Sequence, residues 1–232
     1  MANIVVLDNV SHRQLTVKED YLLQAQDGLG SIPIFPAELD AAHKEFSIFI
    51  RKHSDTGQFF LSALLAPDEN DNVYFDHGRW RSRYIPLMAR RGPFLMAKAN
   101  DDDAINMCID LDDKRVHADG ERLFDEHGKP GALTERTAAI LNLIHQGHQQ
   151  TTVLLNALTA LNLIEPININ TTLSGDSGAM FSGLYSINAD KLKRHDTAIT
   201  ALNAAGYLQH AYFIASSASN VIALLERSAI AP

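Results

Sequence analysis

The feature that most constrains this chain is a run of apolar positions between residues 133 and 161. They recur at steps of three and four residues, at Leu133, Ile140, Leu141, Ile144, Leu154, Leu155, Leu158 and Leu161. This spacing lines one face of an α-helix, and it predicts a single amphipathic helix of about 28 residues, about 42 Å long. Pro166 ends the pattern, and Gly147 near its middle marks either a bend or a close helix crossing.

Short apolar runs separated by turn residues lie on both sides of this pattern in the sequence. Residues 46–50 and 58–65 predict a β-hairpin with a short loop that contains glycine. Residues 94–97 and 105–110 are a second pair of strand candidates. Residues 167–187 show period-two alternation before a turn rich in serine and glycine, and an apolar run after it, which predicts a third hairpin.

The order of these elements indicates the fold class. Short strands come in runs and the helices segregate, which is typical of an α+β fold and not of alternating βαβ units. We predict a mainly antiparallel β part over residues 1–130, packed with a helical part over 131–232 that contains the long helix and the inserted hairpin. Because the chain shows no internal repeat and no flexible linker, we expect residues 1–232 to form one domain, with this division as the alternative.

Composition excludes several classes of protein. The 232 residues carry a formal net charge of -8, which argues against binding to nucleic acid. The single cysteine, Cys108, excludes an intramolecular disulfide, and its apolar run predicts a small core residue. No stretch approaches the ~20 apolar residues of a membrane span, and the start lacks the basic and apolar regions of a secretory signal. We therefore expect a soluble, cytoplasmic protein. Export by a route that needs no cleaved signal is the alternative.

The most unusual local feature is the arginine segment, residues 79–91, which holds five of the 20 lysines and arginines. If residues 79–83 are extended, side chains alternate between faces, so that Arg79, Arg81 and Arg83 share one face. Three guanidiniums on one face would hold a carboxylate or phosphate by forked hydrogen bonds. The alternative is that these arginines pair with nearby aspartates or are simply solvated.

The candidate contact residues all come from this segment. Trp80 and Tyr84 are interpreted as core or interface anchors, because the acidic balance of the chain does not favour base stacking. We assign ligand or partner binding to Arg79, Trp80, Arg81, Arg83, Tyr84, Arg90 and Arg91. No catalytic residue, cofactor site or metal site is assigned.

Two other groups of polar residues have less specific interpretations. His145 and His148 are three residues apart, a spacing that can place two imidazoles on one metal, but no third ligand follows and a polar helix face is favoured. In the last predicted helix, four polar residues interrupt the apolar face. This pattern indicates a packing seam of small residues or part of a polar pocket. The four residues are Ser216, Ser217, Ser219 and Asn220.

Three segments in order resemble the bacterial SapC family, named for a component associated with a surface layer. They are residues 78–86 (GRWRSRYIP) continuing through 90–94, residues 108–110 with 123–130 (LFDEHGKP), and residues 183–192 (GLYSINADKL). The resemblance extends over nearly the whole chain. It implies an accessory role linked to surface-layer or envelope biology, beside flavin-dependent halogenase-like or cupin-like proteins as partners. It carries over no catalytic residues.

We favour a non-catalytic accessory or partner-binding protein that uses the arginine segment and the long helix as contacts. The alternative is a small-molecule or peptide-modifying enzyme component that holds an anionic ligand with Arg79, Arg81 and Arg83. That reading requires a concave pocket with an acid or base, for which His77 and Tyr84 are the candidates. A third hypothesis is a lattice subunit, which predicts a homo-oligomer.

Overall fold

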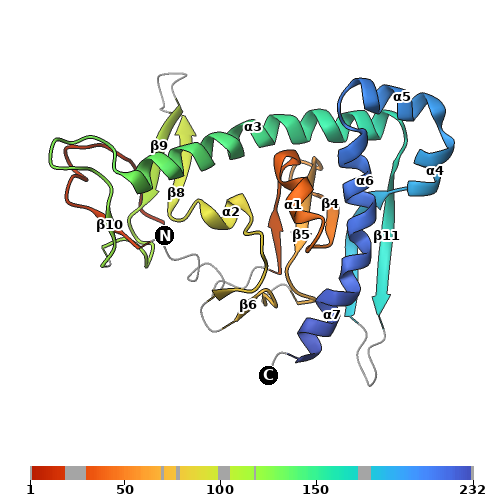
Figure 1. Cartoon of the computed structure of the whole chain (residues 1–232), viewed down its shortest axis with the longest axis horizontal. Helices are drawn as coiled ribbons and strands as arrows, with labels where there is room; N and C mark the ends of the chain where they lie inside the picture. Colours follow the sequence, from red (N-terminus) through yellow and green to blue (C-terminus); the bar gives the residue numbers. More distant parts are fainter. Residues whose placement is uncertain are drawn as a thin grey trace. The chain divides into compact units, whose positions relative to one another are not determined.

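The computed structural model describes residues 2–18, 30–68, 71–76, 79–98, 105–117, 119–171 and 179–230 (Figure 1). Antiparallel sheets and helices make up the structure, which confirms the predicted α+β class. The chain divides into two compact units. Unit 1 consists of Met1–Gln26 and Leu87–Gln146, and unit 2 consists of Asp27–Pro86 and Gly147–Pro232. The expectation of a single domain stays a prediction.

Unit 1 is built on a three-stranded antiparallel sheet. Its order is β1 (Ile4–Val6), β9 (Ile105–Asp110) and β8 (Phe94–Lys98), so the predicted pairing of the last two strands is confirmed. The short helix α2 (Leu87–Arg90) precedes β8 in the chain. A smaller ladder pairs β2 (Thr16–Val17) with β10 (Glu121–Arg122).

The predicted long helix is confirmed as α3 (Ala132–Ala160), which has 29 residues. Two side-chain interactions fix its start. Thr134 Oγ1 donates to the carbonyl of Leu123 at 2.7 Å, and the amide of Leu133 donates to Glu121 Oε1 at 3.0 Å. These bonds use polar groups of the first helical turn, where the backbone N–H groups lack helical partners. The first half of α3 belongs to unit 1 and the second half to unit 2.

Unit 2 is built on a five-stranded antiparallel sheet. Its order is β11 (Ile164–Thr171), β12 (Ala179–Ile187), β4 (Ile48–Lys52), β5 (Phe59–Leu64) and β3 (Ser31–Pro33). The pairs β4–β5 and β11–β12 confirm two of the predicted hairpins, while residues 172–178 lie outside the described residues. The pairing of Tyr185 with Ile50 joins the two hairpins into one sheet.

The remaining elements of unit 2 are short. One ladder pairs β6 (Phe75–Asp76) with β7 (Arg79–Trp80). The 3₁₀ turn η2 (Pro36–Glu38) leads into α1 (Leu39–Ala42), as Pro at the first turn allows. The C-terminal part forms α4 (Ala189–Arg194), α5 (Asp196–Ala204), α6 (Leu208–Ser217), η3 (Ala218–Asn220) and α7 (Val221–Ile230).

Gly147 marks a close approach, although to the side chain of Phe35 and not to a second helix as predicted. A Cβ added at this position would lie 2.6 Å from Cγ of Phe35. Real Cβ atoms do not approach carbon so closely, and Phe35 is itself buried in the core of unit 2. Glycine at 147 therefore lets α3 pack directly on the Phe35 ring.

Two polar residues of the predicted small-residue seam anchor β4. The amide of Ile48 donates to the buried Ser217 Oγ at 3.0 Å. Asn220 Nδ2 donates to the carbonyls of His43 and Phe46, at 2.8 and 3.0 Å. These bonds satisfy backbone groups just before and at the start of β4, which is a role that residue spacing alone did not indicate.

Candidate anion-binding site

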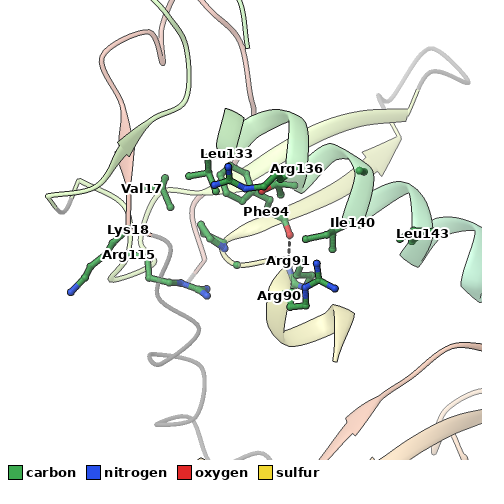
Figure 2. A pocket seen from close by; sticks show the side chains of 14 residues that line it. Val17, Lys18, Arg90, Arg91, Phe94, Arg115, Leu133, Arg136, Ile140 and Leu143 are labelled. Atoms are coloured by element: carbon green, nitrogen blue, oxygen red, sulfur yellow. Dashed lines mark hydrogen bonds between the residues drawn. The ribbon is translucent and has the colours of Figure 1, made fainter. Parts of the chain in front are cut away.

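Unit 1 contains a cavity of about 270 Å³ that we call the cationic pocket (Figure 2). The turn from α2 into β8 forms one side, and the first half of α3 forms another. Val17 and Lys18 at the end of β2, together with Arg115, complete the lining. Figure 2 shows Arg90 and Arg91 on the α2 side, and Arg136, Ile140 and Leu143 on α3.

The ionisable side chains that line the cationic pocket are all basic. They are Lys18, Arg90, Arg91, Arg115 and Arg136. Among the described residues that line it, there is no carboxylate, imidazole or thiol. Since low-dielectric walls focus the field of such charges, the pocket presents a positive potential in a chain whose net charge is negative.

Arg91 carries a buried donor without a hydrogen-bond partner among the described residues. Its Nη1 donates to the carbonyl of Phe94 at 2.6 Å, whereas its Nε is buried without a hydrogen-bond partner among the described residues. Burial lowers the pKa of the Arg91 guanidinium, the neighbouring charge of Arg115 lowers it further, and Asp113 offsets part of this. Because an unpaired buried donor is unfavourable, Arg91 would gain from an acceptor placed in the pocket.

Arg115 is held in place by Asp113. Its Nε donates to Asp113 Oδ1 at 2.8 Å and its Nη2 donates to Asp113 Oδ2, a bidentate pair in which the arginine side chain is only 3% exposed. Burial alone would raise the pKa of the Asp113 carboxyl, but hydrogen bonds and charge from Arg115 outweigh this and the pKa is lowered. The third nitrogen, Nη1, makes no hydrogen bond among the described residues and faces the Gly92 turn.

The wall formed by α3 is apolar with one charged group at its rim. Leu133 and Ile140 are buried, and Leu143 is 44% exposed. Arg136, on the same helix, pairs with Glu121 at 3.2 Å. A ligand in the cationic pocket would therefore meet hydrocarbon on one side and guanidinium groups on the other.

The structure separates the candidate residues of the arginine segment into two groups. Arg90 and Arg91 line the cationic pocket of unit 1, whereas the candidates from Arg79 to Tyr84 belong to unit 2. The prediction of an extended run over 79–83 is wrong, because β7 ends at Trp80 and the chain bends at residues 82–84. The strand alternation that would align Arg79, Arg81 and Arg83 on one face is therefore missing.

The bend after β7 is held by Glu45. Its Oε2 accepts the amide of Arg83 at 2.8 Å, and its Oε1 accepts the amide of Tyr84 at 2.9 Å. The Tyr84 hydroxyl donates to the buried Glu38 Oε1 at 2.8 Å. These bonds make Tyr84 an anchor of this segment, in agreement with the prediction of a core or interface residue.

A second depression lies around this bend, and we call it the Glu45 hollow. It is lined by Ala41, Lys44, Glu45, Arg83, Tyr84 and Arg227. Its cations, Lys44, Arg83 and Arg227, are all exposed, whereas Arg90, Arg91 and Arg115 of the cationic pocket are half-buried or buried, and the lining of the hollow includes a carboxylate. The guanidinium of Arg83 is exposed and makes no hydrogen bond or ion pair with another described residue. Trp80 is half-buried in β7.

Sequence reasoning missed Arg115 and Arg136. Neither is close in sequence to the arginine segment, and only the fold brings them to Arg90 and Arg91. One signal was present for Arg136, because it lies three residues after Leu133 and four before Ile140 on the apolar face of the predicted helix. Arg115 carried no comparable signal.

The other polar candidates lie apart from the cationic pocket lining. His148 packs edge-on against Phe35, with ring centroids 4.8 Å apart. Cys108 is buried in β9, as predicted. No group of three His, Cys, Asp or Glu side chains that could hold a metal is found in the described part of the chain. His77 lies outside it.

The comparison with protein families shows the family of the chain. The model of the SapC family matches residues 7–224. The chain belongs to the SapC family. The matched region contains the whole arginine segment as well as Arg115 and Arg136, so both the cationic pocket and the Glu45 hollow, apart from Arg227, lie inside it.

The other comparisons add no relatives. No curated protein and no solved structure matches this SapC-family chain. Within the described residues, none of the helices combines the length and the apolar character needed to cross a bilayer.

Proposed function

We propose that this SapC-family protein is a non-catalytic accessory protein that binds a protein partner through the cationic pocket. The observation that carries the proposal is the buried Nε of Arg91, which lacks a hydrogen-bond partner among the described residues beside a second buried guanidinium. Two like charges held together in a partly desolvated place are stabilised when an anion enters. A carboxylate of a partner would supply that anion.

The lining groups favour binding over chemistry. Guanidinium and ammonium groups orient and neutralise anions, but a general base must accept a proton near neutral pH. Thr137 supplies the hydroxyl of the pocket, and the described lining residues include no carboxylate, imidazole or thiol that could act as its general base. The enzyme hypothesis placed its anionic ligand on Arg79, Arg81 and Arg83, and the Glu45 hollow near Arg83 has a carboxylate in its lining, which disfavours an anion there.

The biological setting is proposed from the family alone. A link to surface-layer or envelope biology follows from the SapC family, and flavin-dependent halogenase-like and cupin-like proteins are the first partners to test. A homo-oligomer is the alternative, in which a second copy of this acidic chain supplies the carboxylate.

Quantitative affinity capture tests the proposal. The tagged full chain and two double variants are incubated with extracts of the cells that make it, and retained proteins are quantified by mass spectrometry. The pocket variant is Arg90→Ala with Leu143→Ser. The control variant is Arg79→Ala with Val153→Ser, which removes one exposed arginine and one exposed apolar side chain (54% exposed) of the same helix.

The expected result is a partner that the wild type and the control variant retain and that the pocket variant loses by about tenfold or more. Equal retention by all three proteins would overturn the proposal. Loss of the partner in the control variant alone would mean that the partner contacts Arg79 of β7 and Val153 in the second half of α3.

A further inference from the structure

We infer that the cationic pocket recognises a carboxylate that stands beside a large apolar side chain. This inference rests on the proposed function, because it specifies which part of the protein partner enters the pocket. The pocket combines two kinds of surface within one cavity of about 270 Å³, and each kind restricts the ligand.

The first restriction is one anionic group of small size. Arg91 has a buried Nε without a partner among the described residues, and Arg115 leaves Nη1 without a hydrogen bond while Asp113 occupies its other two nitrogens. Arg90, half-buried at the end of α2, makes no side-chain hydrogen bond or ion pair with another described residue. Arg115 Nη1 lies near the Gly92 turn, which directly follows Arg90 and Arg91 in the chain, and a planar carboxylate can accept from more than one guanidinium donor.

The second restriction is an apolar neighbour of the anion. Leu143 lies half-exposed on the wall of the pocket, above Ile140. A bulky side chain packed there would bury hydrocarbon on both partners, which contributes about 25 cal/mol per Å² of area removed from water. An anion without such a neighbour would leave this wall in contact with water.

Net charge argues against a polyanion as the ligand. The whole chain carries -8, so a long phosphate polymer would be repelled outside the pocket even though five cations line its interior. A single carboxylate on an apolar body satisfies the local cations without that repulsion. Acidic side chains and chain ends both provide this chemistry.

Short capped peptides separate these requirements. Binding of acetyl-Leu-Glu-amide to the full chain is measured by calorimetry and compared with three peptides and one ion. Acetyl-Leu-Gln-amide removes the charge, acetyl-Ala-Glu-amide removes the apolar body, and acetyl-Gln-Leu with a free carboxyl end moves the anion to the chain terminus. Inorganic phosphate tests an anion alone.

We expect the neutral peptide, the alanine peptide and phosphate each to bind at least about tenfold more weakly than acetyl-Leu-Glu-amide. Tighter binding of the free carboxyl end would identify a partner's C-terminus as the source, and tighter binding of the glutamate peptide would identify a side chain. Equal binding of the neutral and charged peptides, or of phosphate and the charged peptide, would overturn the inference.

Variants place the binding in the pocket. Arg90→Ala and Leu143→Ser should each weaken the glutamate peptide by about fivefold or more, whereas Arg79→Ala and Val153→Ser should leave it unchanged. Both pocket positions are partly exposed, so these variants are expected to fold, which circular dichroism verifies. Peptide binding that survives both pocket variants would contradict the inference.

The outcomes distinguish this inference from the proposed function. If affinity capture depends on the pocket but no peptide binds, the function stands and the ligand chemistry is wrong. If the peptides bind in the pocket but no captured protein depends on it, the ligand chemistry stands and the accessory function is wrong.

Discussion

The cationic pocket of unit 1 and the Glu45 hollow of unit 2 both contain arginines, but these arginines differ in burial and in hydrogen bonding. In unit 1, Arg115 is 3% exposed and Arg91 has a buried Nε without a partner among the described residues. In unit 2, Arg83 is exposed, and the carboxylate of Glu45, which lines the hollow, accepts a hydrogen bond from its backbone amide.

The difference shows that a count of arginines does not locate a site. Exposed guanidiniums are hydrated and screened, so their interaction with an added anion is weak. Buried guanidiniums have lost that hydration, and each new hydrogen bond to them is worth more. Four predictions on three variants test how the two units differ.

The largest expected effect comes from Asp113→Asn. This change leaves the buried Arg115 charge without its carboxylate, and it should lower the free energy of unfolding by about 3 kcal/mol. The control is Asp40→Asn, whose partner Lys44 lies 3.4 Å away with both side chains exposed, and which should change stability by less than about 0.5 kcal/mol. Urea unfolding at pH 7 measures both. Equal losses of stability in the two variants would show that the buried and the exposed ion pair do not differ in energy.

The same variant has a defined pH dependence. The pKa of Asp113 is lowered in the folded protein, so its contribution to stability is fully present above the ordinary value of 3.8 and is lost as the pH falls from there through the lowered pKa. The gap in stability between wild type and Asp113→Asn should therefore narrow in acid. A gap that stays constant from pH 7 to pH 3 would show that the carboxylate charge is not what stabilises Arg115.

A middle-sized effect is expected from Gly147→Ala in the unit 2 half of α3. The new methyl group would overlap Phe35, so we expect a loss of about 1–3 kcal/mol despite the better helix propensity of alanine. Gln146→Ala, at the exposed neighbouring position, should change stability by less than about 0.5 kcal/mol. Thermal and urea unfolding measure both variants. A stabilising Gly147→Ala would show that α3 does not pack tightly on Phe35 at this position.

The smallest effect is expected from Glu45→Gln. A neutral amide accepts hydrogen bonds more weakly than a carboxylate, so the bonds from Arg83 and Tyr84 should weaken by about 1 kcal/mol. Hydrogen exchange of these two amides should then accelerate by about fivefold. Glu226→Gln, on the exposed side of α7, is the control. Unchanged exchange would mean that Glu45 does not hold the bend.

The sequence predicted the scaffold well because periodicity is a local property. The long helix and the paired strands follow from spacing within each segment, and the structure confirms them as α3 and the hairpins of both sheets. The end of β7 at Trp80 was not predictable in this way, because it depends on Glu45, more than 30 residues away in sequence, accepting two amides.

The candidate site was predicted only in part for the same reason. Arg90 and Arg91 were found because they are dense in the sequence, and Arg115 was missed because its role depends on burial beside Asp113. Local density of charge does not indicate which guanidinium loses its water. That property arises from segments brought together by the fold.

The most direct test follows the Nε–H groups of the arginines by nuclear magnetic resonance while acetyl-Leu-Glu-amide is added to the full chain. Arg91 should show the largest change in proton shift, because its Nε is the buried donor without a partner among the described residues, and Arg83 should show none. Assignment by Arg91→Lys and Arg83→Lys identifies the two signals. A shift at Arg83 with Arg91 unchanged would contradict the account.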